Sequence, residues 1–378
     1  MATENNNKNL NVPNLRFPEF SGEWKKTYIG ECFSKVENGL TYDTNNTSGV
    51  PVTRIETISD KSINYDRVGY ASVDDKISKY RMQYGDILFS HINSLKHIGK
   101  TAFYNATQPL YHGMNLLLLR SKKSLDSKFL YYTLNTYRFL HRCQVLANQA
   151  VNQASINTKE LKSVNISVPQ MLEQRKIAEF ISLLDERIDT QIKIIEKLES
   201  LIKGLCQKLT QQDNPNTALN ETLVCYSSTL QESSVQEVGD YPVYGATGVC
   251  GYTDAPEVDG DSILIIKDGA SVGVTYYASG EYSAIGTLNR LVAKSGYSLR
   301  YLYYCLKVFN FAPYRTGLAI PHIYFRDYGK AQVWCPSIEE QSRIANALET
   351  VEQKIATEKS LLEQLYSQKR FLLQAMFI

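Results

Sequence analysis

The sequence lacks the features of a membrane or secreted protein. None of its 378 residues fall in a run approaching 18 consecutive apolar side chains, and residues 1–7 (Met-Ala-Thr-Glu-Asn-Asn-Asn) form no apolar signal region. The seven cysteines are odd in number, widely scattered and never spaced Cys-x-x-Cys, so neither a disulfide framework nor a zinc site is indicated. We therefore expect a soluble, cytoplasmic protein with reduced thiols, no metal and no membrane contact.

Catalytic motifs are also missing. The chain has no Gly-x-x-x-x-Gly-Lys-Ser/Thr, no Gly-x-Gly-x-x-Gly after a strand, no His-Glu-x-x-His and no Asn-Pro-Pro-Tyr/Phe, and its five histidines lack metal-ligand spacing. The Gly245-Ala-Thr-Gly248 segment has no following lysine, which favours a hairpin turn over a phosphate loop. Asp86 and Asp261 each follow a glycine, and a turn-closing role is favoured over an active-site carboxylate. We predict no catalytic residue and no cofactor for this chain.

The net charge is small, only +2, but it is unevenly placed. Residues 1–168 carry 21 basic and 14 acidic side chains, whereas residues 213–336 carry 8 and 12. Within that second region, residues 262–336 hold 8 basic against 3 acidic side chains. The charge therefore leaves room for a basic, nucleic-acid-binding face in each half of the chain, although the front of the second half is acidic.

What the chain does contain is one long segment present twice. Displacing the sequence by 167 positions brings Pro169 onto Pro336, Glu173-Gln174 onto Glu340-Gln341, and Ile177-Ala178 onto Ile344-Ala345. Each copy opens with a proline followed by Glu-Gln, which is a helix-start signal, and neither contains an internal proline. Each copy therefore predicts one long helix of roughly 60 Å.

Both copies carry apolar residues at alternating intervals of four and three, the heptad pattern of a coiled coil. Polar residues interrupt it at Gln191 in the first copy, and at Glu358 and Lys369 in the second. The predicted seam consists of Ile177, Ile181, Leu184, Ile188, Gln191, Ile195, Leu198, Ile202, Leu205 and Leu209 in the first copy, and Ile344, Leu348, Val351, Ile355, Glu358, Leu362, Leu365, Leu372 and Met376 in the second.

Because a helix with a narrow apolar stripe buries it on a partner, we predict that the two helices form an intramolecular antiparallel coiled coil. In that arrangement the midpoints meet, so Gln191 and Glu358 would lie in neighbouring layers and could share a hydrogen bond that fixes the register. The alternative is that each long helix packs on its own globular neighbour as an ordinary domain helix.

The globular parts repeat in the same order. Gly260-Asp261 with the following apolar run matches Gly85-Asp86, and residues 301–306 match residues 129–134. The predicted fold class is α+β, with two similar α/β domains separated by an antiparallel two-helix coiled coil and related by an internal pseudo-twofold repeat. The predicted parts are a first domain at 1–168 with residues 1–12 disordered, a helix at 169–212, a second domain at 213–336 and a helix at 337–378.

Several elements of the first domain can be predicted from pattern. Alternation indicates a strand at 50–58, and further strands are expected at 85–89, after a Tyr-Gly break, and at 164–168, before the long helix. Residues 114–119 form a buried apolar run. Residues 125–146 indicate one helix with Phe129, Leu130, Tyr132, Thr133 and Tyr137 facing inward, and residues 148–157 read as a polar loop.

Two similar domains related by a pseudo-twofold axis match the symmetry with which dimeric proteins bind duplex DNA. Since the domains are not identical, they should recognise different half-sites, which gives an asymmetric bipartite target.

Nearly the whole chain resembles the specificity subunit of type I restriction-modification systems. The resemblance lies in Leu15-Arg-Phe-Pro-Glu-Phe-Ser-Gly-Glu-Trp24, the paired Gly-Asp strands, Tyr241-Pro-Val-Tyr-Gly245, Ile320-Pro-His322 and the two Pro-x-x-x-Glu-Gln helix openings. It implies that the globular parts are target-recognition domains, and that the helices act as a spacer that docks two modification (methyltransferase) subunits. Two restriction (motor-nuclease) subunits would complete the assembly. It implies no catalysis by this chain: S-adenosylmethionine and ATP with Mg²⁺ belong to the partners.

Residues that contact double-stranded DNA are predicted from charge and chemistry. Asn and Gln pair with adenine edges, Lys and Arg pair with guanine, and other basic side chains contact phosphate. The candidates lie in loops that follow the Gly-Asp strands and in the segments before each long helix, and for each one the alternative is a solvated loop position. They are Asn93, Lys96, His97, Lys100, Asn152, Gln153 and Asn157 in the first domain, and Lys267, Ser271, Arg315 and His322 in the second.

Two other functions remain open from the sequence. A non-catalytic coiled-coil adaptor could present the two domains to protein partners, and it would show no salt-dependent duplex binding. An enzyme of unrecognised type is the other alternative.

Overall fold

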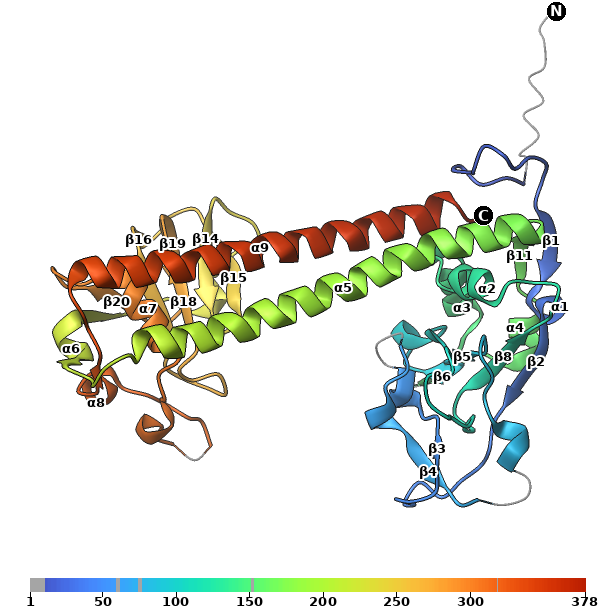
Figure 1. Ribbon diagram of the computed structural model, residues 1–378, viewed down its shortest axis with the longest axis horizontal. Helices are drawn as coiled ribbons and strands as arrows, with labels where there is room; N and C mark the ends of the chain where they lie inside the picture. Colours follow the sequence, from blue (N-terminus) through green and yellow to red (C-terminus); the bar gives the residue numbers. More distant parts are fainter. Residues whose placement is uncertain (1–10, 59–61, 74–76, 151–152, 318) are drawn as a thin grey trace, which may run out of the picture. The chain divides into compact units, whose positions relative to one another are not determined.

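The computed structural model describes residues 11–58, 62–73, 77–150, 153–317 and 319–378 (Figure 1). The chain forms two compact units: the first comprises Met1–Asp189 with Glu363–Ile378, and the second comprises Thr190–Leu362. Both long helices, α5 (Met171–Thr210) and α9 (Ile338–Ala375), therefore contribute one end to each unit.

The first unit is built on a four-stranded antiparallel sheet in the order β2 (Phe33–Asn38), β8 (Leu117–Ser121), β5 (Ile87–Phe89) and β7 (Thr101–Phe103). Both faces of this sheet are buried: Leu117 and Leu119 pack in the core with α2 (Ser127–Leu134), whereas Leu118 packs in a separate core on the other face. Burial of both faces explains why the sequence shows a continuous apolar run here rather than alternation.

Shorter elements complete the first unit. β1 (Lys25–Tyr28) pairs antiparallel with β11 (Asn165–Val168), which leads into α5. The remaining elements are α1 (Ile29–Cys32), β3 (Val50–Val52), β4 (Gly69–Ala71), β6 (Ile92–Asn93), α3 (Tyr137–Leu146), β9 (Asn148–Ala150), β10 (Gln153–Ser155), α4 (Thr158–Lys162) and the 3-10 turns Ile55–Ile58, Tyr65–Arg67, Ile77–Tyr80 and Leu95–His97.

The second unit repeats this plan. Its sheet has the equivalent order β13 (Leu223–Ser227), β20 (Leu288–Ala293), β17 (Ser262–Ile266) and β18 (Thr275–Ala278), and its two faces are again buried in separate cores. The matching parts are β12 (Thr217–Ala218), α6 (Leu219–Thr222), α7 (Leu299–Lys307), α8 (Phe325–Tyr328), β21 (Gln332–Val333) and the 3-10 turns Glu232–Ser234 and Ala312–Tyr314. The internal repeat predicted from the sequence is therefore present in the fold.

A second sheet distinguishes this unit from the first. It has the order β15 (Gly248–Thr253), β14 (Tyr241–Gly245), β19 (Glu281–Ala284) and β16 (Val258–Asp259). β14 and β15 form a hairpin across Ala246 and Thr247, with Gly245 opposite Gly248. The glycine-rich segment is thus a hairpin turn, as predicted.

The long helices pack antiparallel (green α5 and red α9 in Figure 1). In the first unit the start of α5, with Ile177 and Ile181, shares a core with Leu372 and Met376 near the end of α9. In the second unit the end of α5 packs with the start of α9, where Ile202, Ile344, Leu348 and Ile355 share one core with partly buried Leu198, Leu205 and Val351. The same cores contain side chains of the globular domains, so the helices pack on each other and also on their own domains.

The polar layer of the seam forms as predicted. Gln191 Nε2 donates a hydrogen bond to the backbone oxygen of Glu358 (3.1 Å) and another to its carboxylate. Lys354, one turn earlier, pairs with the same carboxylate, and together these contacts lower the pKa of Glu358, with Lys354 as the larger cause. Lys369, the other polar seam residue, pairs with Asp185 of α5.

Three local predictions for the first domain were wrong. Residues 125–146 form two helices, because Thr136 caps a new helix by accepting a hydrogen bond from the Phe139 N–H (3.3 Å), and this break leaves Tyr137 70% exposed instead of inward. Residues 148–157 include the paired strands β9 and β10 and not only loop. The strand at 50–58 ends at Val52, since a 3-10 turn follows.

Candidate nucleic-acid interface

In the first unit, two predicted DNA-contacting residues belong to one small sheet at the end of β5. Its strand order is β6, β10, β9, and Asn93 of β6 lies opposite Ala154, the neighbour of Gln153 in β10. The connection is closed by the Ile156 N–H, which donates to the His91 backbone oxygen (2.9 Å). The fold therefore brings together residues that are 60 positions apart in the sequence.

The side chains of this group differ in how freely they could meet a ligand. Asn93 is half-buried, donates to Ser90 Oγ (3.2 Å) and accepts from the Ser94 N–H (2.8 Å), so its amide is oriented by the loop. Gln153 and Lys96 are exposed, His97 and Lys100 are half-buried, and His97 Nδ1 lies 3.2 Å from Ser94 Oγ.

Asn157 has a structural role that the sequence analysis missed. Its Oδ1 accepts from the Glu160 N–H (2.8 Å), and Glu160 accepts from the Asn157 N–H in return (3.3 Å). This capping box begins α4, and the signal was readable as Asn-x-x-Glu. Asn152, also predicted to contact DNA, lies outside the described residues.

The second unit gathers its four predicted residues around the end of β17. The Lys267 backbone oxygen accepts from the Ile323 N–H (2.9 Å), and Arg315 Nη2 donates to the Val272 backbone oxygen (3.0 Å), next to exposed Ser271. His322 donates from Nδ1 to Asp268 Oδ1 (2.7 Å), and the two residues also pair through their backbones.

The two clusters occupy equivalent places in the repeat. Ile156 donates to His91 in the first unit just as Ile323 donates to Lys267 in the second, immediately beyond β5 and β17 respectively. At the next paired position the first unit has Ile92 opposite Ser155, whereas the second has Asp268 opposite His322. The scaffold is therefore shared while the side chains that it presents differ.

Three residues of the second cluster were not predicted. Asp268 holds His322, and the exposed Tyr324 ring stacks against the His322 ring (centroids 6.5 Å apart) with the Arg326 guanidinium 4.9 Å from its centre. An exposed aromatic ring beside an imidazole and a guanidinium is a surface that suits base or sugar contact. The sequence signal was the alternation His-x-Tyr-x-Arg after Pro321.

The first cluster contains a buried histidine, His91. His91 is 6% exposed, its Nδ1 has no hydrogen-bond partner among the described residues, and burial lowers its pKa to about 4, with a smaller contribution from His112. Burial likewise lowers the pKa of His112, whose Nε2 lies 3.0 Å from the Leu116 backbone oxygen. Both rings are therefore neutral and structural at neutral pH.

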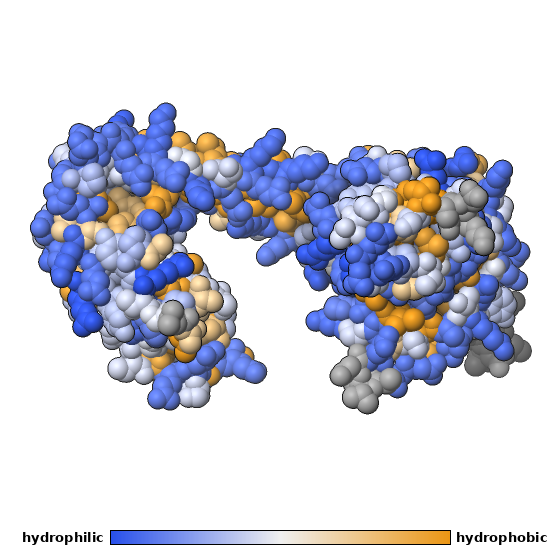
Figure 2. Space-filling view, turned by 90° about the horizontal axis from the view of Figure 1, so that it is seen from below, coloured by the Kyte–Doolittle hydropathy of each residue, from blue (hydrophilic) through white to orange (hydrophobic). Residues whose placement is uncertain are grey.

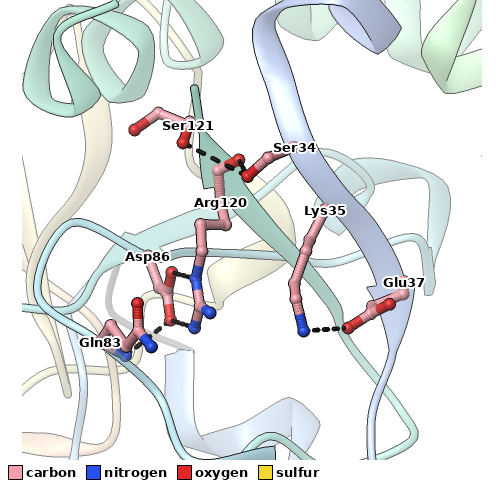
Figure 3. A network of polar contacts seen from close by, with 7 residues as sticks. All are labelled: Ser34, Lys35, Glu37, Gln83, Asp86, Arg120 and Ser121. Atoms are coloured by element: carbon pink, nitrogen blue, oxygen red, sulfur yellow. Dashed lines mark hydrogen bonds and ion pairs between the residues drawn. The ribbon is translucent and has the colours of Figure 1, made fainter. Parts of the chain in front are cut away.

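The aspartates after the paired glycines are structural. Asp86 is buried, accepts from the Gln83 N–H (2.7 Å) and makes a bidentate ion pair with Arg120 (both contacts 2.7 Å), as Figure 3 shows. This turn-closing role is the one favoured from the sequence, and the ion pair raises the pKa of Arg120. Asp261 instead accepts from the Tyr277 hydroxyl (2.7 Å), a contact that supports the raised pKa of that hydroxyl after the larger effect of burial.

The Glu-Gln opening of each long helix attaches that helix to its domain. Gln174 accepts from the Asp126 N–H (2.9 Å) and donates to the Pro169 backbone oxygen (2.8 Å). Gln341 makes the same contacts, with the Ser298 N–H (2.9 Å) and the Pro336 oxygen (2.9 Å). Asp126 and Ser298 are the N-caps of α2 and α7, so each glutamine joins a long helix to the first turn of its domain helix.

The two glutamates differ. Glu173 has no exposed surface and accepts a bidentate pair from Arg16 (2.7 and 2.8 Å) and a hydrogen bond from Trp24 Nε1 (3.2 Å). Glu340 remains on the surface, paired with Arg343 of its own helix, which lowers its pKa. The motif around residues 15–24 thus supplies partners for a buried carboxylate.

Three further findings concern possible metal ligands, the cysteines and helices long enough to cross a membrane. In the part of the chain that the structure describes, no three His, Cys, Asp or Glu side chains are grouped so as to hold a metal ion. All seven cysteines are free thiols, and burial raises the pKa of Cys32 and Cys206 to about 11. No helix among the described residues combines the length and the apolar character needed to cross a membrane.

The fold and these two clusters define a class: proteins that carry two related α+β domains on one antiparallel pair of long helices. A family profile described as "Type I restriction modification DNA specificity domain" matches residues 21–200 and 226–367. The chain therefore belongs to the family of type I restriction-modification specificity (S) subunits.

Individual relatives agree with this assignment. A putative type I restriction enzyme MjaX specificity subunit from Methanocaldococcus jannaschii is 41% identical over 207 residues, which cover 53% of this chain and 49% of that relative. The alignment thus spans about half of the relative's length. The crystal structure of a type I restriction-modification S subunit from M. genitalium has a TM-score of 0.64 at 19% identity, covering 97% of this chain and 99% of that one.

A second solved structure shares the fold at a TM-score of 0.55 and 16% identity, covering 93% of this chain and 96% of the other. Its title describes the structural basis of complex assembly and conformational transition of the type I R-M system.

Proposed function

We propose that this chain is the DNA-specificity subunit of a type I restriction-modification system and recognises an asymmetric, bipartite duplex target. The observation that carries the proposal is the pair of equivalent clusters, beyond β5 and beyond β17, built on one backbone plan with different side chains. A repeated scaffold suits the repeated geometry of duplex DNA. The side chains differ between the units, with Ile92 and Ser155 in one and Asp268 and His322 in the other, and this difference suits unlike half-sites.

Charge and side-chain chemistry support DNA as the ligand. Residues 1–168 carry an excess of seven basic side chains, and residues 262–336 an excess of five, so each cluster lies in a basic part of the sequence. Asn93 and Gln153 can read base edges in the first half-site, with Lys96, His97 and Lys100 nearby for phosphate. In the second half-site, the contacts with bases and phosphates would come from Arg315, Lys267, Ser271 and His322.

Partners would supply the chemistry. In this proposal two modification subunits, which bind S-adenosylmethionine, dock on the helices, and two ATP-dependent restriction subunits join them. Exposed apolar side chains on the helices support docking. Leu172 and Leu183 of α5 and Phe371 of α9 are more than 60% exposed in the first unit, and Leu201 of α5 is 51% exposed in the second. Figure 2 shows hydrophobic residues among hydrophilic ones along the helices.

The long helices are proposed to act as the spacer that sets the gap between half-sites. Two features support this role: each helix is continuous across the boundary between the units, and the Gln191–Glu358 contact fixes one register of the pair.

A domain exchange tests the proposed function. Residues 25–165 would be replaced by the corresponding segment of another specificity subunit, and adenine methylation would be mapped in cells that also express the modification partner. We expect one half-site to change and the other to remain. In parallel, duplex binding by the unaltered complex should weaken steeply between 50 and 200 mM salt.

The same experiment separates this function from a protein-binding adaptor. An adaptor would leave the methylated sequence unchanged after the exchange, and its partners' duplex affinity would not depend on this chain. Either result would contradict the proposal.

A further inference from the structure

The strongest unassigned feature is the Asp268–His322 pair of the second unit. Asp268 Oδ1 and His322 Nδ1 are 2.7 Å apart, and each side chain is about one-third exposed. Among the described residues His322 Nε2 has no hydrogen-bond partner: the hydrogen bonds of this residue go to Asp268 and Thr316, and its ring contact is with Tyr324. One ring nitrogen is therefore held and the other is free.

The contact with Asp268 decides which nitrogen carries the proton. An ionised carboxylate can only accept a hydrogen bond, so Nδ1 must be the protonated nitrogen. In the neutral imidazole this leaves Nε2 as an acceptor with a lone pair directed away from Asp268. An imidazole without such a partner can carry its proton on either nitrogen.

This pair is not required by the backbone plan. At the equivalent register position the first unit pairs Ile92 with Ser155, and it forms the same backbone connection from Ile156 to His91. The backbone connection forms in the first unit with an isoleucine and a serine at these positions, so it does not need an Asp–His pair. We take the partly exposed, hydrogen-bonded pair of the second unit as a sign of a role in recognition.

We propose that His322 reads the exocyclic amino group of an adenine or cytosine in the second half-site, and that Asp268 is the positioning residue that fixes His322 as an acceptor. In the major groove only these two bases present an amino donor, at N6 and N4 respectively. Guanine and thymine present oxygen acceptors there and would meet the lone pair of Nε2. The inference rests on the proposed function and adds the class of base edge.

The test is selection of duplexes from a randomised library, carried out at pH 8 by the full-length chain in its complex with the modification partner. His322→Ala should relax one base position of the second half-site, where the wild-type chain selects adenine or cytosine, and should weaken binding of the wild-type target roughly tenfold. His322→Gln, whose amide reaches the place of Nε2, should retain adenine at that position.

Asp268→Ala distinguishes positioning from a merely structural role. Without the carboxylate the imidazole can place its proton on Nε2, so this variant should newly tolerate guanine or thymine at the same position while the first half-site stays unchanged. Replacing the selected adenine by 2-aminopurine, which lacks the N6 amino group, should weaken binding by the wild-type chain and have no effect on His322→Ala. The matched control is Ser155→Ala, which should leave the second half-site unaltered.

Three results would overturn the proposal. Selection of guanine or thymine by the wild-type chain at the position that His322→Ala relaxes would overturn the acceptor assignment. If the wild-type chain selects a target, and His322→Ala and Asp268→Ala select the same bases at every position, the reading role of His322 is overturned while the proposed function stands. If the wild-type complex enriches no sequence, the proposed function fails and this inference falls with it.

Discussion

At the scale of single residues, identical letters in the two copies have different consequences because their surroundings differ. Glu173 and Glu340 occupy the same place in the repeated motif. The segment at residues 15–24 covers Glu173 and supplies Arg16 and Trp24, whereas Glu340 has only Arg343 on the surface of its own helix. A buried carboxylate depends on its partners far more than an exposed one does.

The first prediction follows from this contrast. Glu173→Gln should destabilise the first unit by about 2 to 3 kcal/mol, because it breaks a bidentate ion pair and leaves the Arg16 charge without a counter-ion. Urea unfolding followed by Trp24 fluorescence in a Trp334→Phe background reports on this unit, since these are the two tryptophans of the chain. Glu340→Gln, followed by Trp334 in a Trp24→Phe background, should leave the unfolding midpoint of the second unit nearly unchanged. Equal losses in the two variants would refute the argument.

The second prediction concerns pH. The pKa of His91 is about 4 in the folded protein against 6.5 for an ordinary imidazole, so the unfolded chain binds the proton more tightly. The stability that this neutral ring contributes is complete above pH 6.5 and declines as the pH falls toward 4; between pH 7.5 and 5 the loss is about 2 kcal/mol. His91→Gln should remove that part of the pH dependence.

The control is His97→Gln, which replaces a half-buried histidine six residues further along the chain and leaves His91 in place. The measurement is the free energy of unfolding of the first unit at several pH values. A His91→Gln profile as steep as that of the unaltered chain would count against the assignment.

At the scale of elements, the repeated glutamine explains how a long helix is attached to a compact domain. Gln174 and Gln341 are nearly fully buried, and each satisfies one carbonyl before the long helix and one N–H at the start of a domain helix. Backbone groups at helix starts lack partners within the helix, and this side chain provides them.

The third prediction tests this attachment. Gln174→Ala should destabilise the first unit by about 1 to 2 kcal/mol, since it leaves two buried backbone groups unsatisfied, and Gln341→Ala should do the same in the second. Gln207→Ala, on an exposed face of α5, is the matched control and should have no measurable effect. Chemical denaturation of the three variants measures the free energy of unfolding. If Gln174→Ala leaves it unchanged, water replaces the amide and the prediction is wrong.

At the scale of the whole molecule, the repeat connects fold to function. Each unit contains one end of α5 and one end of α9, and the first unit joins two separate segments of the chain, Met1–Asp189 and Glu363–Ile378. Exchange of a target-recognition region therefore has to preserve the helix ends on which that region packs. This constraint favours residues 25–165 over the whole of residues 1–189 for such an exchange.

The fourth prediction concerns the spacer. Inserting one heptad after Gln191 in α5 and one before Glu358 in α9 keeps the seam in register and lengthens the pair by about 10 Å. The gap in the methylated target should grow by about two to three base pairs while both half-sites stay the same, at about 3.4 Å per base pair. Methylation mapping measures the gap. A heptad in α5 alone should abolish methylation, and an unchanged gap after the paired insertion would rule out the spacer role.

The order of the amino acids was enough to predict the repeat, the two long helices, their antiparallel seam and the Gln191–Glu358 layer, because heptad spacing and internal similarity are properties of order along the chain. It also indicated the turn role of Asp86. The folded chain was needed for the break at Thr136, the exposure of Tyr137, the burial of Glu173 and the pairing of Asp268 with His322. These depend on which side chains and backbone groups the fold leaves without water, and that is settled by packing between segments rather than by local pattern.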